Sequence, residues 1–253
     1  MGNYRFFIHL AYNGSGFHGW QLQQNAHTVQ QELQNALSVL TGNSVSLTGA
    51  GRTDTGVHAR NFYAHFNLDY LLDKSELHQL EFKLNRFLPS SILVIEIFRV
   101  KPDIHARFSA ISRIYRYYIS QRKDPFSSDL SWIYTSRLDL EMMKAAAGIL
   151  MEYKDFTCFS KSGTQTSTND CTIFESYFEQ KNHLLIYHVK ANRFLRNMVR
   201  AIVGTMIEAG KGNLDTDSLR NLIENGTRSD AGMSVPANGL FLEEIEYPVD
   251  IRY

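Results

Sequence analysis

The segment Gly49–Ala59 holds one carboxylate, Asp54, among residues that could put it to chemical use. Its sequence is GAGRTDTGVHA, with three glycines, two threonines and one arginine around the acid. Glycine lets a backbone turn tightly or come close to a ligand, and threonine hydroxyl groups hydrogen-bond neighbouring carboxylates. Arg52 adds a fixed positive charge two residues before Asp54. The pattern indicates a nucleophile or general base, with a structural Asp in a polar turn as the alternative.

Asp54 and the two residues after it also spell the Asp-Thr-Gly triplet of the aspartic proteases. That chemistry needs two carboxylates that share one proton. The sequence holds no second Asp-Thr-Gly or Asp-Ser-Gly, since Asp230 is followed by Ala231 and Gly232 and the hydroxyl is missing. The protease interpretation is therefore disfavoured.

Basic and aromatic residues are interleaved in the segment 101–123. It contains six basic residues and one acidic residue, Asp103, with Asp124 directly after it, together with one phenylalanine and three tyrosines. In an extended strand, Arg113, Tyr115 and Tyr117 would lie on one face. Cations for phosphate and rings for base faces are typical of a surface that binds RNA. The alternative is a solvated strand with tyrosines in the core.

A second basic group consists of Arg193, Arg196 and Arg200. Their spacings of three and four predict that all three lie on one side of a helix that starts at this point. The stretch between Asn192 and Met206 contains no acidic residue. We expect these arginines to bind RNA phosphate or a buried acid such as Asp54.

The elements that must position these groups follow the order β-α-β-β-α-β twice. In the first half we expect strands near 6–12, 45–47, 62–68 and 92–100, and helices that begin at Thr28 and Ser75. In the second half we expect an extended segment 107–120, a helix capped by Asp139, a hairpin of 172–178 and 184–189, helices over 197–209 and near 219–223, and a strand over 239–247. This order predicts an α+β protein of two ferredoxin-like halves, 1–104 and 105–253, with antiparallel sheets that flank a basic central cleft.

Composition narrows the class of protein further. The 253 residues are 43% hydrophobic and include 26 basic and 26 acidic side chains, so overall charge does not point to an acidic partner. Two cysteines are too few for a disulfide framework, and the nine histidines show no spacing typical of a metal site. Because neither a signal peptide nor an apolar stretch of membrane-spanning length is visible, we expect a cytoplasmic protein without a bound metal.

Read together, the motifs resemble those of the TruA family of tRNA pseudouridine synthases. The segment Gly49–Ala59 is similar to the family signature, and four further stretches agree in order. They are Tyr12–Gly14 with Phe17–Gln21, Ala106–Ala110 with Arg113–Tyr117, Phe194–Arg200, and Ala231–Gly232 leading to Pro236–Leu240. The chain departs from the family pattern where Asn13 stands for the usual Asp, Cys171 is near a usual Arg, and Val235 replaces a usual Ala.

The resemblance implies isomerisation of uridine to pseudouridine in the anticodon stem-loop of tRNA, at tRNA positions 38–40, by a homodimer without a cofactor. It implies three catalytic residues. Asp54 is the nucleophile, Tyr115 stacks on the flipped-out base and lies near the proton lost from C5, and Arg196 pairs with Asp54 and keeps it ionised. It also implies that Arg52 holds the extruded nucleotide and that Leu240 forms part of an apolar wall. With them we expect Arg113, Arg193 and Arg200 to bind the RNA.

The main alternative is a non-catalytic RNA-binding module, because ferredoxin-like sheets also build RRM domains. The aromatic signature of that module is missing from the sequence. A carboxylate in the glycine loop would also repel phosphate in a protein that only binds RNA.

Overall fold

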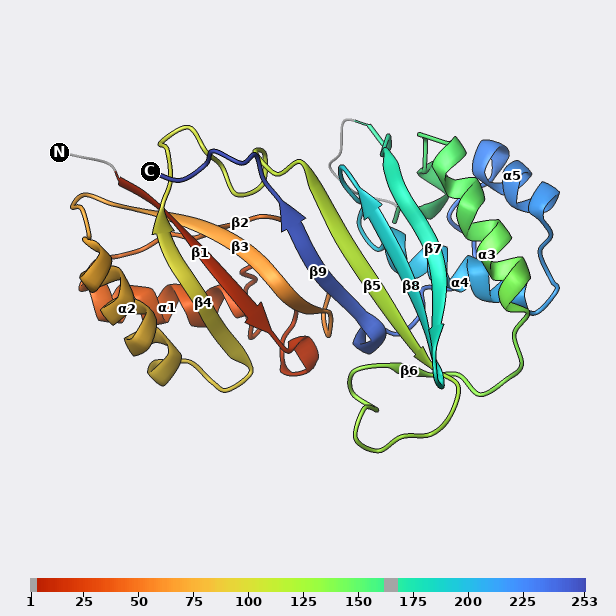
Figure 1. Cartoon of the computed structure of the whole chain (residues 1–253), viewed down its shortest axis with the longest axis horizontal. Coiled ribbons are helices and arrows are strands. Elements are labelled where there is room, and N and C mark those ends of the chain that lie inside the picture. Colours follow the sequence, from red (N-terminus) through yellow and green to blue (C-terminus); the bar gives the residue numbers. More distant parts are fainter. Residues whose placement is uncertain (1–3, 162–167) are drawn as a thin grey trace. The chain divides into compact units, whose positions relative to one another are not determined.

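The computed structural model describes residues 4–161 and 168–253, which form two compact units. The first unit comprises Met1–Ile111 and Leu242–Tyr253, and the second comprises Ser112–Phe241. Helices and strands are mixed along the chain, and the strands pair mostly in antiparallel fashion (Figure 1). The predicted α+β class is confirmed.

The first unit is built around β1 (Tyr4–Tyr12), which lies between β4 (Ile92–Arg99) and β3 (His58–Leu68). Both pairings are antiparallel, and a short β2 (Thr48–Gly49) pairs with β3. Apolar residues dominate β1, and Phe6, Phe7, Ile8 and Leu10 are fully buried. Burial of this strand contributes to the hydrophobic driving force for folding of the unit.

Two helices complete this part of the unit, and their first residues test the predicted caps. As predicted, α1 (Val29–Thr41) begins after Thr28, and the Thr28 side chain accepts a hydrogen bond from the Gln31 backbone. The cap predicted at Ser75 is wrong, because α2 (Lys74–Phe87) begins after Asp73. Asp73 and Glu76 form a capping box, with nitrogen–oxygen distances of 2.9 and 2.8 Å. A cap at Ser75 would have no Glu or Gln three residues later. The side chains of Asp73 and Glu76 together satisfy two backbone N–H groups, whereas Ser75 alone could satisfy one.

The chain returns to the first unit through β9 (Leu240–Glu246), whose residues from Leu242 onward belong there. Lys101 donates its backbone N–H to Ile251, and the Arg252 guanidinium binds the Glu96 carboxylate at 2.6 and 2.7 Å. Contacts therefore group residues 105–111 and 242–253 with the first unit. The predicted division into halves 1–104 and 105–253 stays a prediction.

The second unit has the strand order β5 (Ser112–Ser120), β8 (Leu184–Ala191) and β7 (Ile173–Lys181), all antiparallel. A short β6 (Trp132–Ile133) runs parallel to β5. The predicted hairpin is confirmed, and its turn uses Asn182 in the left-handed region at φ 55°. α3 (Leu140–Ile149) packs against β7, α4 (Met198–Gly210) and α5 (Thr216–Asn225), and α4 is buried along nearly its whole length.

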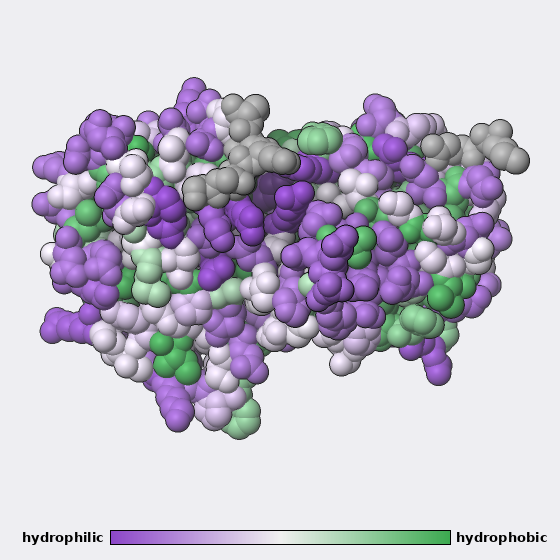
Figure 2. All heavy atoms as spheres, turned by 180° about the vertical axis from the view of Figure 1, so that it is seen from behind, coloured by the Kyte–Doolittle hydropathy of each residue, from purple (hydrophilic) through white to green (hydrophobic). Residues whose placement is uncertain are grey.

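The face drawn in Figure 2 is mainly hydrophilic, with hydrophobic side chains in small separate areas. Within the described ranges, no helix combines the length and the apolar character required to cross a membrane.

Candidate active site

Asp54 lies in the connection between β2 and β3, which two backbone hydrogen bonds hold in place. Ala50 donates its N–H to the Tyr63 carbonyl at 2.8 Å, and Val57 donates to the Asp54 carbonyl at 3.1 Å. The second bond closes a tight turn in which Gly56 takes φ +80°, a conformation that favours glycine. Asp54 is thereby half-buried at the start of a defined turn.

The residue before Asp54 is anchored by its side chain as well. Thr53 is buried, and its hydroxyl lies 2.9 Å from the Tyr12 hydroxyl of β1. The backbone N–H of Trp20 also donates to this hydroxyl oxygen at 3.1 Å. Rigid support of this kind is what a catalytic carboxylate requires.

A second loop, residues 13–20, packs against the Asp54 loop backbone to backbone. A Cβ on Gly19 would lie 2.2 Å from the Thr53 carbonyl oxygen, and one on Gly14 would lie 2.0 Å from that of Val57. Gly19 also has φ +84°. Asn13, which stands where the family usually has Asp, belongs to this loop. Its side chain accepts a hydrogen bond from the Ser15 backbone at 3.0 Å.

In the second unit, β5 places Arg113, Tyr115 and Tyr117 at alternate positions, which confirms the predicted strand. The rings of Tyr115 and Phe194 pack in a T-shaped contact with centroids 5.1 Å apart, and Arg113 donates to the Asn192 carbonyl at 2.8 Å. The structure thus brings the predicted strand together with the segment that leads to α4. Tyr117 has a structural role and does not face a ligand, because its side chain is fully buried and its hydroxyl donates a hydrogen bond to the Pro236 carbonyl.

The prediction that three arginines share one helix face is wrong. α4 begins only at Met198, so Arg193 and Arg196 precede it and Arg200 alone lies on it. Asn197 takes φ 65°, in the left-handed region, which separates the preceding turn from the helix. Arg196 is exposed, whereas Arg200 is half-buried and donates its Nε to the Val235 carbonyl at 2.7 Å.

The segment that carries Leu240 is held against α4 and β5. A Cβ on Gly204 of α4 would lie 1.8 Å from the Met233 carbonyl oxygen, and Gly232 donates its N–H to the Thr205 hydroxyl at 2.9 Å. Leu240 itself is buried, as an apolar wall requires. The departure at Cys171 is buried as well, with its sulfur 4.0 Å from that of Met198.

The candidate residues divide between the two units. Arg52 and Asp54 belong to the first, and the remaining six belong to the second: Arg113, Tyr115, Arg193, Arg196, Arg200 and Leu240. The predicted pairing of Asp54 with Arg196 involves both units and stays a prediction. Across residues 4–161 and 168–253, no three His, Cys, Asp or Glu side chains are grouped so that they could hold a metal ion.

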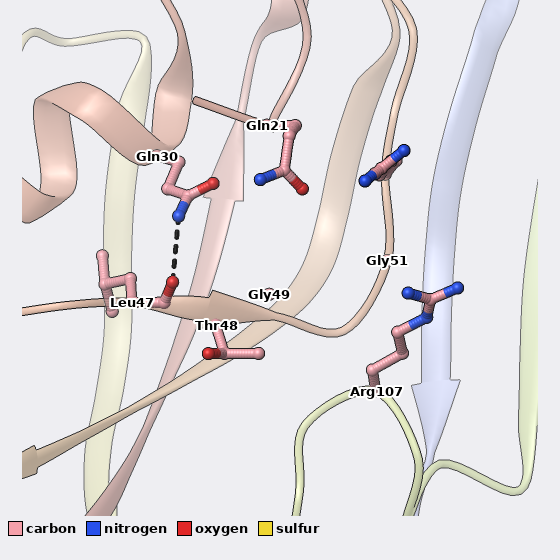
Figure 3. Close-up of a pocket in the computed structure, with 8 residues that line it drawn as sticks. Gln21, Gln30, Leu47, Thr48, Gly49, Gly51 and Arg107 are labelled. Atoms are coloured by element: carbon pink, nitrogen blue, oxygen red, sulfur yellow. Dashed lines mark hydrogen bonds between the residues drawn. The ribbon is translucent and has the colours of Figure 1, made fainter. Parts of the chain in front are cut away.

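Sequence reasoning missed a hollow of about 150 Å³ beside the Asp54 loop (Figure 3). It is lined by Gln21, Gln30, Leu47, Thr48, Gly49, Gly51, Arg52 and Arg107. These residues come from four separate segments of the chain, so no local pattern could have revealed the hollow. The signal that was available is the pair of motifs around Arg52 and Arg107.

Comparison with known proteins identifies the family. The family model described as tRNA pseudouridine synthase matches residues 147–248. A tRNA pseudouridine synthase A from Parabacteroides distasonis is 47% identical over 247 residues, which cover 98% of this chain and 97% of the relative. The protein of the same name from Bacteroides fragilis is 45% identical, with 99% of both chains covered, and that from Thermoanaerobacter sp. is 38% identical, with 95% and 98% covered. Because the identity is this high along nearly the whole length of both aligned chains, the chain belongs to the tRNA pseudouridine synthase A family.

Proposed function

We propose that the chain isomerises uridine to pseudouridine in the anticodon stem-loop of tRNA, with Asp54 as the catalytic carboxylate. Family membership makes it a pseudouridine synthase, an isomerase. The choice of Asp54 is supported by one observation above all: its loop is fixed by β3, by the buried Thr53 hydroxyl and by the glycine contacts of loop 13–20. A surface Asp without a functional role does not require a loop held by so many contacts.

The reaction defines what the site must do. The bond between uracil N1 and ribose C1′ breaks, the base turns, C5 bonds to C1′, and the proton on C5 is lost while N1 gains one. Both C1′ and C5 must be reached, so the nucleotide has to leave the base stack. Asp54 attacks C1′ or removes a ribose proton, and the Tyr115 ring, backed by Phe194, offers a face on which the base can stack.

A carboxylate that acts as nucleophile or base must be ionised, and a neighbouring cation favours that state. The family resemblance assigns this cation to Arg196. The contacts favour Arg200 instead, because its Nε is held by the Val235 carbonyl whereas Arg196 is exposed. Arg52, Arg113 and Arg193 then bind RNA phosphates, and Leu240 excludes water from the activated ribose.

The finer architecture is part of the same proposal: two ferredoxin-like halves that flank a basic cleft, in a cytoplasmic homodimer. Its support in the first unit is the order β1, α1, β2, β3, α2, β4, and in the second unit it is the set of arginines around β5 and α4. The alternative function, a binding module without catalysis, makes the same use of the arginines but has no use for Asp54.

The test is the nearly isosteric change Asp54→Asn. Tritium release from C5-labelled uridine in tRNA should become undetectable, while the affinity for tRNA stays within about threefold, because hydrogen-bonding atoms are kept and the reactive oxygen is lost. Asp69→Asn, at an exposed Asp after β3, is the matched control and should react at the wild-type rate.

Activity of Asp54→Asn within about tenfold of wild type would remove Asp54 from the mechanism. A wild-type protein that binds tRNA and releases no tritium would support the binding module.

A further inference from the structure

The hollow beside the Asp54 loop has a distinct chemical character. Among the described residues that line it are two arginines, two glutamines and no acidic side chain. The Gln30 side chain serves as wall, since its amide nitrogen donates to the Leu47 carbonyl at 2.9 Å and its oxygen accepts from Leu22 at 3.0 Å. Gln21 and Arg107 come from different segments of the chain, and the side chains of both lie near the strand that carries Gly49 (Figure 3).

Gly51 belongs to the Asp54 loop and also lines the hollow. An ideal Cβ on Gly51 would meet no atom within 4 Å, and its φ is not positive, so neither packing nor backbone strain requires a glycine here. Gly49 differs, because a Cβ there would lie 2.2 Å from the Trp20 indole nitrogen. A glycine that the fold does not require leaves room for the close approach of a ligand.

The loop that carries Arg107 is fixed by two histidines. His65 of β3 is buried, and its Nδ1 accepts a hydrogen bond from Ala106 at 3.1 Å. The Nδ1 of His105 accepts from the backbone N–H groups of Arg107 at 3.1 Å and Phe108 at 3.3 Å. Three consecutive backbone donors are thus held in place. The fold therefore presents the exposed Arg107 at a set position beside the hollow.

We propose that this hollow is a subsite for one phosphodiester of the tRNA backbone, next to the nucleotide that reacts at Asp54. Arg52 and Arg107 supply the positive charge, and Gln21 supplies a neutral donor. The inference rests on the proposed function, because it takes tRNA as the substrate, and it adds Arg107 and Gln21 to the residues that position the tRNA.

Size and charge favour a phosphate over other ligands. About 150 Å³ is well below the roughly 300–1,000 Å³ of pockets that enclose a whole small molecule, so a single group of a larger ligand fits best. Guanidinium groups match phosphate oxygens through paired hydrogen bonds. Because Arg52 is two residues from Asp54, a phosphate bound here would belong to the chain near the reacting nucleotide.

The test compares Arg107→Gln with wild type and with Arg86→Gln, a control at an exposed arginine of α2. Binding of a fluorescent anticodon stem-loop is measured at several salt concentrations. Arg107→Gln should weaken binding about fivefold or more at low salt and reduce the slope of log affinity against log salt by roughly 0.7–0.9, the share of one phosphate contact. Arg86→Gln should change neither, and Arg107→Lys should recover most of the slope.

A scan with single methylphosphonates locates the contact. At one position the neutral linkage should weaken binding by wild type and leave binding by Arg107→Gln unchanged, because that variant has already lost the contact. Gly51→Leu, which the fold can accommodate at Cβ, should give the same loss by filling the hollow.

The proposal is overturned if Arg107→Gln behaves like Arg86→Gln, or if every methylphosphonate affects wild type and Arg107→Gln equally. Pseudouridine formation at saturating tRNA is measured separately. A wild-type protein without that activity contradicts the proposed function, while the binding data alone decide the subsite.

Discussion

At the scale of single residues, Arg196 and Arg200 differ in how the fold holds them. The Arg200 side chain is half-buried and tied to the Val235 carbonyl, whereas Arg196 is exposed and its backbone carbonyl accepts from Lys161 at 3.4 Å. A cation that keeps a carboxylate ionised must stay close to it, which a fixed side chain achieves at less entropic cost. The sequence could identify both arginines, but not which one is held, because that depends on a carbonyl 35 residues away.

This difference leads to a comparison of Arg196→Met with Arg200→Met. We expect that in Arg200→Met the single-turnover rate falls at a higher pH than in wild type as the solution is made more acidic. Loss of the cation favours the protonated, inactive form of the catalytic carboxylate. Arg196→Met should weaken tRNA binding and leave the profile in place. The rates are measured at saturating tRNA, and thermal melting shows whether each variant is folded. A profile that moves in Arg196→Met alone would support Arg196, as the family resemblance implies, in place of Arg200.

At the scale of elements, the order of helices and strands was predictable because hydrophobic periodicity is a local property. The predictions were wrong where the start of a helix depends on several residues acting together or on tertiary contacts. Asp73 caps α2 in place of Ser75 through a box with Glu76, and Asn197 delays α4 until Met198. The hollow and the histidine contacts to loop 105–109 were not predictable, since His65 and Ala106 lie 41 residues apart.

The packing of loop 13–20 on the Asp54 loop predicts unequal effects of two glycine substitutions. Gly19→Ala should lower the free energy of unfolding by about 2 kcal/mol or more, because it combines a positive φ with a Cβ placed 2.2 Å from the Thr53 carbonyl oxygen. Gly16→Ala, in the same loop with no atom within 4 Å of its Cβ, is the control and should change stability by less than about 1 kcal/mol. Urea denaturation measures both, and equal values would show that the two loops are not packed as described.

At the scale of the whole molecule, a formal net charge of zero means that attraction to RNA must come from local groups of cations. Stability should depend on pH through His65, whose pKa is lowered to about 4 by burial, by Arg5 and by His105. Because the folded pKa lies below the unfolded value of 6.5, this stabilisation is complete above about pH 6.5 and is lost as the pH falls to about 4.

We therefore expect the first unit to lose up to roughly 3 kcal/mol of stability between pH 6.5 and pH 4 through His65. In His65→Asn the amide oxygen can accept the Ala106 hydrogen bond without titrating, so this part of the loss should disappear. His78→Asn, at an exposed histidine of α2, controls for histidine replacement in general. Denaturation curves at several pH values measure the difference, and identical pH dependence in wild type and His65→Asn would contradict it.

The return of the chain to its first unit at Leu242 affects how the protein is made. A ribosome completes residues 112–241 before it adds the segment that binds Lys101 and Glu96. Until residues 242–246 emerge, β3 lacks the β9 neighbour that it has in the finished sheet, and open strand edges invite association between nascent chains. The unit that is begun first is thus finished last, and its exposure lasts for the time needed to translate the other.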